Sequence, residues 1–115
     1  MQFAFRDIEP DFYRARLLEI RKESGCWGDY LRFIFTVTDG ELRGAEFSGF
    51  IKPTALKYSK FYRWVRNIFG EDPPSDFSDK DLVGKDCLIF ISKKNDRFYS
   101  VTEVCMICDL NQWVI

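Results

Sequence analysis

The chain contains no histidine. This absence excludes Ser-His-Asp and Cys-His catalysis and removes the commonest metal ligand, the imidazole ring. No stretch of the sequence approaches the ~18 apolar residues of a membrane-spanning helix. Residues 1–7 also lack the apolar core of a signal peptide. We therefore expect a cytoplasmic protein with no membrane contact and with reduced cysteines.

A strong positive charge is also missing. The net charge is −1, whereas nucleic-acid-binding domains are often strongly basic. The charge is unevenly distributed, however. Residues 12–66 carry eleven Lys and Arg against six Asp and Glu, a local charge of +5, and residues 67–115 carry −4. A local basic surface attracts polyanions even on a nearly neutral chain, although an asymmetry of this size also arises by chance.

The composition is that of one globular domain. A length of 115 residues fits a single domain over residues 1–115, and 46% apolar residues are enough for a core without metal or disulfides. The turn signal Glu9, Pro10, Asp11 closes a lead-in arm, residues 1–11. Residues 106–115 are interpreted as a C-terminal tail, which covers the end of the fold or adds a short strand.

Five segments show the period-two alternation of strands: residues 12–23, 30–38, 45–52, 87–92 and 98–105. In the first segment the phase slips, because Leu18 and Ile20 take over the apolar face from Ala15 and Leu17. Such a slip indicates a β-bulge or a strand that bends across two sheets. The long first strand of a small barrel needs this bend.

A helix is predicted between the third and fourth strands. Thr54 is a candidate N-cap and Gly70 a candidate C′ residue, with about 15 amphipathic residues between them. Its outer face is basic, with Lys60, Arg63 and Arg66. The order of elements predicts an all-β fold with one helix, a five-stranded antiparallel OB-type barrel. A split α+β sheet is the main alternative.

The chain resembles small phage and prophage OB-fold proteins in five segments: FYRARL (12–17), YLRFIFTVTDG (30–40), GAEF (44–47), SKFYRWV (59–65) and DLVGK (81–85). Members of that family are taken to bind single-stranded DNA in replication or recombination. The resemblance therefore implies the OB fold and this function. Its motifs are turn glycines and core alternation, and they carry no catalytic residue to transfer.

OB barrels bind single strands across the second and third strands and the flanking loops, using aromatic rings for bases and cations for phosphates. Phe50 alternates out of phase with Phe47 and Ile51, so it is expected to be exposed if they are buried. Trp27, beside loop glycines, is the aromatic residue least easily explained as core. The predicted nucleic-acid-binding residues are Arg14, Arg16, Trp27, Tyr30, Arg32, Phe50, Lys52, Lys93, Lys94 and Arg97.

Each of these residues also has a structural interpretation. Phe50 is alternatively covered by Phe3 or Phe5 of the arm, and Arg14 and Arg16 alternatively only keep an outer face soluble. The basic helix face is alternatively an ordinary solvated surface.

No cofactor, metal or enzymatic activity is predicted. Cys105 and Cys108 form a single CxxC, whereas structural zinc needs four ligands and Cys26 and Cys87 stand alone. There is no phosphate-binding loop. Free thiols that serve packing are the expected state of all four cysteines.

The preferred hypothesis is sequence-tolerant binding of single-stranded nucleic acid, DNA or RNA. The alternative is a protein–protein adaptor or a self-associating OB domain that does not bind nucleic acid. Its partner is then a replication protein or a second copy of the chain. The near-zero net charge and the apolar tail residues Trp113, Val114 and Ile115 favour this alternative, since such a tail can add to the edge of a neighbouring sheet.

Overall fold

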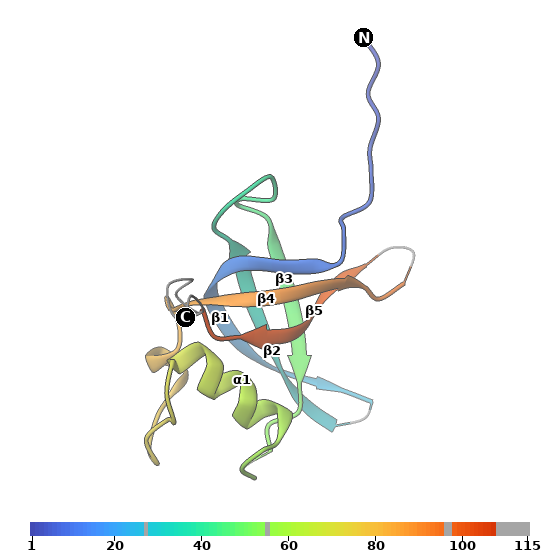
Figure 1. Ribbon diagram of the computed structural model, residues 1–115. Helices are drawn as coiled ribbons and strands as arrows, with labels where there is room; N and C mark the ends of the chain where they lie inside the picture. The colour runs from blue at the N-terminus through green and yellow to red at the C-terminus, as the bar shows by residue number, and fades with distance from the viewer. Residues whose placement is uncertain (27, 55, 96–97, 108–115) are drawn as a thin grey trace.

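The computed structural model describes residues 1–26, 28–54, 56–95 and 98–107. It contains β1 (Asp11–Gly25), β2 (Gly28–Val37), β3 (Glu46–Ile51), α1 (Lys60–Phe69), the short 3-10 helix η1 (Asp79–Asp81), β4 (Asp86–Lys93) and β5 (Tyr99–Cys105), in that order (Figure 1). All strands are antiparallel and form one sheet in the order β3-β2-β1-β4-β5. The prediction of a mainly β fold with one helix between the third and fourth strands is confirmed.

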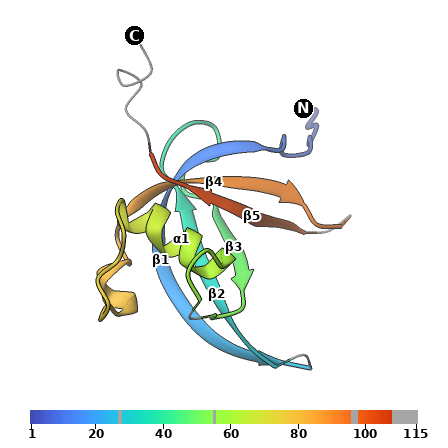
Figure 2. The ribbon, with the colours of Figure 1, turned by 60° about the horizontal axis from the view of Figure 1, so that its bottom comes forward.

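The phase slip predicted in the first strand is present as a register shift between Leu17 and Glu19. Leu18 is the extra residue and is 40% exposed, so its predicted place on the apolar face is wrong. Residues 11–16 of β1 pair with β4, and pairing with β2 begins at Ala15, so that beyond the shift β1 pairs with β2 alone. Figure 2 shows β1 as one long curved strand. The two halves of β1 therefore belong to different parts of the surface.

The core lies on the concave side of the sheet. Phe33, Phe35 and Val37 of β2 are buried, as the alternation predicts, and so are their counterparts on β4, Cys87, Ile89 and Ile91. Trp64 of α1 is fully buried, with its ring edge-on to Phe33 at 5.6 Å between centroids. The helix thus covers the inner layer, and the outer face of β2–β3 stays free of it.

Gly49 allows α1 and β5 to approach β3. A Cβ atom at this position would lie 2.6 Å from the Trp64 ring and 3.1 Å from Val101 Cβ, both closer than normal packing. The two edge strands, β3 and β5, therefore come close together across the core. In the described part of the chain no hydrogen-bond ladder joins them, so closure of the sheet into a barrel stays a prediction.

The helix begins later than predicted. The N-cap is Ser59, whose Oγ accepts a hydrogen bond from the Tyr62 backbone N–H at 3.1 Å, and Thr54 is not the cap. Tyr58, just before it, has a left-handed backbone (φ +67°), which is incompatible with a helix continuing from Thr54. The helix has 10 residues instead of about 15, while Gly70 ends it as predicted.

The N-terminal arm projects from the body (Figure 1). Its inner part is attached: Ile8 N–H donates to Tyr99 Oη at 3.0 Å, and Tyr13 Oη donates to the Glu9 carbonyl at 2.7 Å. Its outer part exposes Phe3 and Phe5. The tail segment 108–115 lies outside the described residues. Within the described residues, no helix has the length and apolar character that crossing a membrane requires.

Candidate nucleic-acid interface

Phe50 lies at the centre of an exposed cluster on the outer face of β2 and β3. Its ring is 40% exposed and meets the Tyr30 ring edge-on, at 5.8 Å between centroids. Two cations lie over it: the Arg32 guanidinium carbon at 5.8 Å and Lys94 Nζ at 5.4 Å from the ring centroid. We call Tyr30, Arg32, Phe50 and Lys94 the Phe50 cluster.

Strand register explains why these side chains meet. Arg32 of β2 is the direct partner of Phe50 on β3, and Tyr30 lies two positions along the same face. Lys94 comes from the β4–β5 hairpin, where its N–H donates to the Phe98 carbonyl at 2.8 Å. The prediction that Phe50 is exposed, out of phase with Phe47 and Ile51, is confirmed: Ile51 is buried and Phe47 is half-buried, whereas Phe50 is exposed.

The arm does not cover the Phe50 cluster. Phe3 and Phe5, the two rings that were alternatives for covering Phe50, are 78% and 98% exposed. The alternative in which the arm hides Phe50 is therefore wrong.

Glu23 of β1 organises the polar groups of the cluster. Its Oε2 accepts a hydrogen bond from Tyr30 Oη at 3.0 Å, and its Oε1 lies 3.5 Å from a terminal nitrogen of Arg32. Arg32 Nε also donates to Ser48 Oγ at 2.9 Å. The hydrogen bond to Glu23 raises the pKa of Tyr30, so the Tyr30 phenol is uncharged at neutral pH and its ring is held in place.

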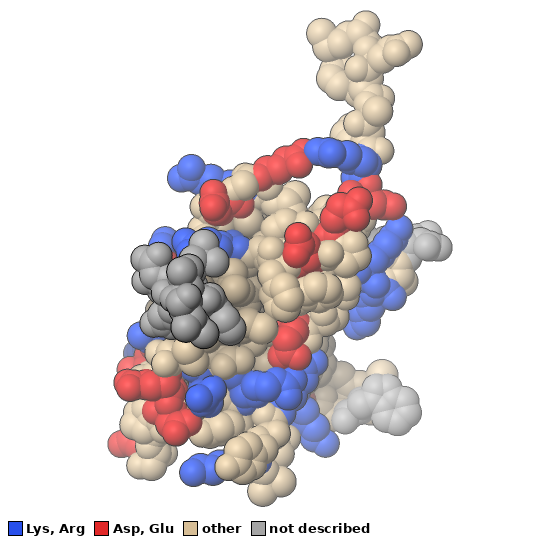
Figure 3. Space-filling model, in the orientation of Figure 1, with Lys and Arg blue, Asp and Glu red and all other residues tan. Residues whose placement is uncertain are grey.

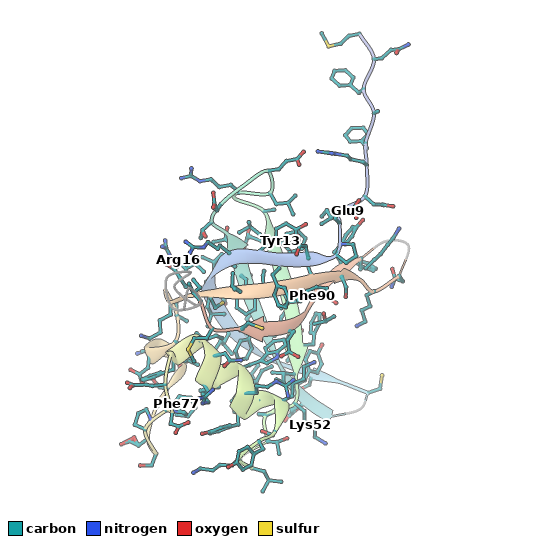
Figure 4. All side chains as sticks on the ribbon, viewed as in Figure 1. Glu9, Tyr13, Arg16, Lys52, Phe77 and Phe90 are labelled. Atoms are coloured by element: carbon teal, nitrogen blue, oxygen red, sulfur yellow. The ribbon has the colours of Figure 1, made fainter. Side chains whose placement is uncertain are left out.

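Lys52 continues the surface beyond the end of β3. It is exposed and lines a hollow of about 190 Å³ together with Tyr30 and the β1–β2 hairpin residues Gly25, Gly28 and Asp29. In Figure 4 its label lies near the end of β3 and the start of α1. Lys52 therefore adds a cation next to the Tyr30 side of the Phe50 cluster.

Arg21 is a neighbour that the sequence analysis missed. It is the direct partner of Arg32 across the β1–β2 ladder and pairs with Glu19 through an N–O contact of 2.9 Å. The phase slip contains the information to find it: once Ile20 turns inward, Glu19, Arg21 and Glu23 must turn outward. In the space-filling view, basic side chains gather along the right-hand edge and over α1 (Figure 3).

Three predicted residues lie apart from the Phe50 cluster. Arg16 is the partner of Thr36, four positions along β2 from Arg32, which is about 13 Å at 3.3 Å per residue. Its Nε contacts Asp86 at 2.9 Å, and Figure 4 shows it on the opposite side of the molecule from Lys52. Arg14 lies beside Leu88 of β4, and Lys93 Nζ lies 3.6 Å from Asp7 of the arm.

Trp27 and Arg97, the remaining two predicted binding residues, lie outside the described residues.

The cysteines show no metal site among the described residues, where no three potential ligands from Cys, Asp and Glu are grouped. Cys87 is buried in the core, and desolvation raises the pKa of its thiol to about 12. Cys26 at the β1–β2 turn is exposed. Cys105 is half-buried, and Cys108 lies outside the described residues.

The sequence matches no protein-family model and no curated protein. The chemistry of the surface is therefore argued from its own geometry. The Phe50 cluster offers an aromatic pair, in which Phe50 is exposed and Tyr30 half-buried, two cations over the Phe50 ring and further cations at its borders, Arg21 and Lys52. These groups suit a ligand that has both flat rings and negative charges.

Proposed function

We propose that the protein binds single-stranded nucleic acid, DNA or RNA, without marked sequence preference, and that its sheet is an OB-type barrel. Bases stack on Phe50 and Tyr30, and phosphates contact Arg32, Lys94 and Lys52. Base stacking on aromatic side chains is sequence-tolerant because every base has a flat face.

The strand arrangement supports the OB assignment. An OB barrel is a partly open five-stranded barrel whose binding surface is the second and third strands, bordered by the loops between strands one and two and between strands four and five. Here the edge strands β3 and β5 approach each other at Gly49. The Phe50 cluster lies on β2 and β3 and receives Lys94 from the β4–β5 hairpin. Trp27, which lies outside the described residues, stays part of the proposal from its place in the sequence next to Gly28.

The single observation that carries the function is the environment of Phe50. A large apolar ring that is 40% exposed loses part of the gain from burial. Lys94 and Arg32 lie over that ring within 6 Å. An aromatic surface bordered by cations is what single-strand binders present to bases and phosphates.

Glu23 weakens the positive field but does not block it. Its ion pair with Arg32 is partly exposed, with 29% of the Glu23 and 37% of the Arg32 side chain accessible. Exposed and half-exposed ion pairs contribute only about 0–1 kcal/mol. A phosphate oxygen therefore replaces the carboxylate as partner of Arg32 at little cost.

A fluorescence titration tests the proposal. Labelled oligothymidylate, oligouridylate and a DNA duplex are titrated at two salt concentrations. We expect single strands to bind more tightly than the duplex, with an affinity that falls steeply with salt because counterions are released. Replacing Phe50 and Trp27 by Ala weakens binding by more than about tenfold, from stacking of ~1–3 kcal/mol per base. Absence of single-strand binding at low salt contradicts the proposal.

A second candidate function is docking to a protein partner or to a second copy of the chain. The arm favours it, because Met1, Phe3 and Phe5 are exposed at alternate positions of an extended segment. Such a segment can add to the edge of another sheet. Deletion of residues 2–5 followed by light scattering tests it: loss of an oligomer together with absent nucleic-acid binding supports this function over the first.

A further inference from the structure

A second aromatic and basic surface lies on α1 and on the segment that precedes it. A hollow of about 550 Å³ is lined by Lys57, Tyr58, Tyr62, Arg63, Arg66 and Asp72. Tyr62 and Arg66 are four residues apart on one face of α1. Tyr58 precedes the helix, and its ring contacts the Tyr62 ring.

Tyr58 is presented to solvent. Its side chain is 88% exposed, and it is the one residue other than glycine with positive φ in the described part of the chain. A bulky residue in this conformation is uncommon. Its ring meets Tyr62 edge-on at 6.3 Å between centroids. The two tyrosines give this hollow an aromatic wall.

Asp72 holds the other side of the hollow in place. Its Oδ1 accepts hydrogen bonds from Tyr62 Oη at 2.8 Å and from Arg66 Nε at 3.2 Å. The hydrogen bond from Tyr62 is the main cause that lowers the pKa of Asp72, so the carboxylate stays charged and fixes both partners. Arg66 remains 48% exposed beside Asp72, and Lys57 adds positive charge, whereas Arg63 is paired with Glu103 at 3.0 Å.

A short segment of the chain connects the end of β3, beside the Phe50 cluster, to the α1 hollow. Lys52, at the end of β3, precedes Lys57 by five residues. Hydrogen bonds keep the connecting segment folded back: Thr54 Oγ1 donates to the Lys52 carbonyl at 3.5 Å, and Ser59 Oγ donates to the Thr54 carbonyl at 3.3 Å. In Figure 4 the Lys52 label lies beside the first turn of α1. Lys52 and Lys57 therefore both lie on the segment that connects β3 to α1.

We infer that the α1 hollow is a second contact for the same single strand: a strand held at Phe50 passes Lys52 and stacks a further base on Tyr58, with phosphates near Lys57 and Arg66. This inference rests on the proposed function. It predicts a binding site that is longer than the β2–β3 face, within the ~4–16 nucleotides that one OB fold occupies.

The test compares oligothymidylates of about 6 and about 16 nucleotides, the range of single OB folds, by fluorescence anisotropy with the full chain. The variant is Lys57→Gln with Tyr58→Ala, at two exposed positions. Its affinity for the long strand is expected to fall about tenfold, as for the loss of one stacked base. Its affinity for the short strand is expected to stay within twofold. The matched control, Lys80→Gln with Val83→Ala, also removes one cation and one exposed apolar side chain, and it is expected to bind both strands like the wild type.

The outcomes separate the two proposals. If the wild type binds both lengths and the variant binds like the wild type, the α1 contact is wrong while the proposed function stands. Equal loss at both lengths also contradicts the inference, because the hollow would then be part of the primary site. If the wild type binds neither strand, the proposed function fails, and the inference that rests on it fails as well. Circular dichroism melting of the variant checks that its fold is intact.

Discussion

The outer surface of the sheet carries two aromatic pairs, one on each side of the bend in β1. Tyr30 and Phe50 lie on β2 and β3, and Phe12 and Phe90 lie on β1 and β4, with rings edge-on at 5.8 and 4.9 Å. Arginines occur beside both pairs in the sequence. Only the first pair has cations over a ring: among the described residues, no Lys or Arg lies over Phe12 or Phe90.

The difference comes from the register of β1. Before the bulge at Leu18, the residues with even numbers point outward, and Arg16 there meets Asp86, which neutralises it. After the bulge the outward residues have odd numbers, and Arg21 adjoins Arg32. Among the described residues, the same residue types thus place two cations over an aromatic ring on one side of the bend and none on the other, although ion pairs occur on both sides. Aromatic and basic residues on one face therefore indicate a candidate nucleic-acid site only where the cations lie over the rings.

Removing the first aromatic pair is expected to have the largest effect. The variant Tyr30→Ala with Phe50→Ala loses both stacking surfaces, each worth ~1–3 kcal/mol per base, so its affinity for oligothymidylate falls by at least about tenfold. The variant Phe12→Ala with Phe90→Ala, on the other side of the bend, is the control. Fluorescence titration measures the affinity of both variants for oligothymidylate. If the control loses as much affinity as the Tyr30 and Phe50 variant, the difference between the two aromatic pairs is wrong.

Gly49→Ala tests the packing beneath Phe50. The added Cβ would lie 2.6 Å from the Trp64 ring, so α1 or β3 must shift. Overpacking of this kind costs about 1–3 kcal/mol of unfolding free energy. Urea unfolding measures it, with the exposed neighbour Glu46→Ala as the control. A stability equal to that of the wild type shows that the close approach of α1 and β3 is wrong.

Removing single cations distinguishes the Phe50 cluster from the arginines before the bend in β1. Arg32→Gln and Lys94→Gln are each expected to lower affinity a few-fold and to reduce the salt slope by about 0.7, the value for one phosphate on a single strand. Arg14→Gln and Arg16→Gln are expected to leave the slope unchanged. Titrations at several salt concentrations give these slopes. Equal slopes for the two groups mean that both sides of the bend contact the strand.

Glu23→Gln is expected to give the smallest effect, and in the opposite direction. Removing the carboxylate takes a negative charge from the path of the phosphates and releases Arg32 from its ion pair. We expect the binding free energy to improve by about 0.2–1 kcal/mol, the usual strength of an exposed ion pair. Affinity therefore rises by between about 1.4-fold and about fivefold. The pKa of Tyr30 moves down toward its ordinary value, since the hydrogen bond to the carboxylate is what raises it. Glu46→Gln, on the exposed face of β3, is the control, and weaker binding by Glu23→Gln contradicts the proposed path.

The sequence predicts the strands, the single helix and most of the core, because burial imposes a period of two on β4 and a period of 3.6 on α1. On β2 the inward residues alternate as predicted, but Ile34 on the opposite face is buried as well, which the alternation does not predict. Phe33, Phe35, Ile89 and Ile91 follow directly from that alternation. The exposure of Phe50 follows from the same rule. Closure of the sheet does not follow, since it depends on how β3 and β5 meet at Gly49.

The helix start and half of the candidate site depend on information that a pattern does not contain. Thr54 and Ser59 are equally good caps by residue type, and the left-handed Tyr58 decides between them. Arg14 and Arg16 alternate correctly with the core, but the direction in which they face depends on the bend at Leu18. Lys94 joins Phe50 through a hairpin more than forty residues away, which no local pattern predicts.

The central claim is that a single strand lies on the outer face of β2 and β3. Backbone amide NMR spectra of the labelled protein, recorded while oligothymidylate is added at low salt, test it most directly. We predict that the largest shifts occur in residues 30–32, 48–52 and 94, and that residues 12–16 and 88–90 stay unchanged. Shifts centred on Phe12 and Phe90, or no shifts at all, would contradict the account.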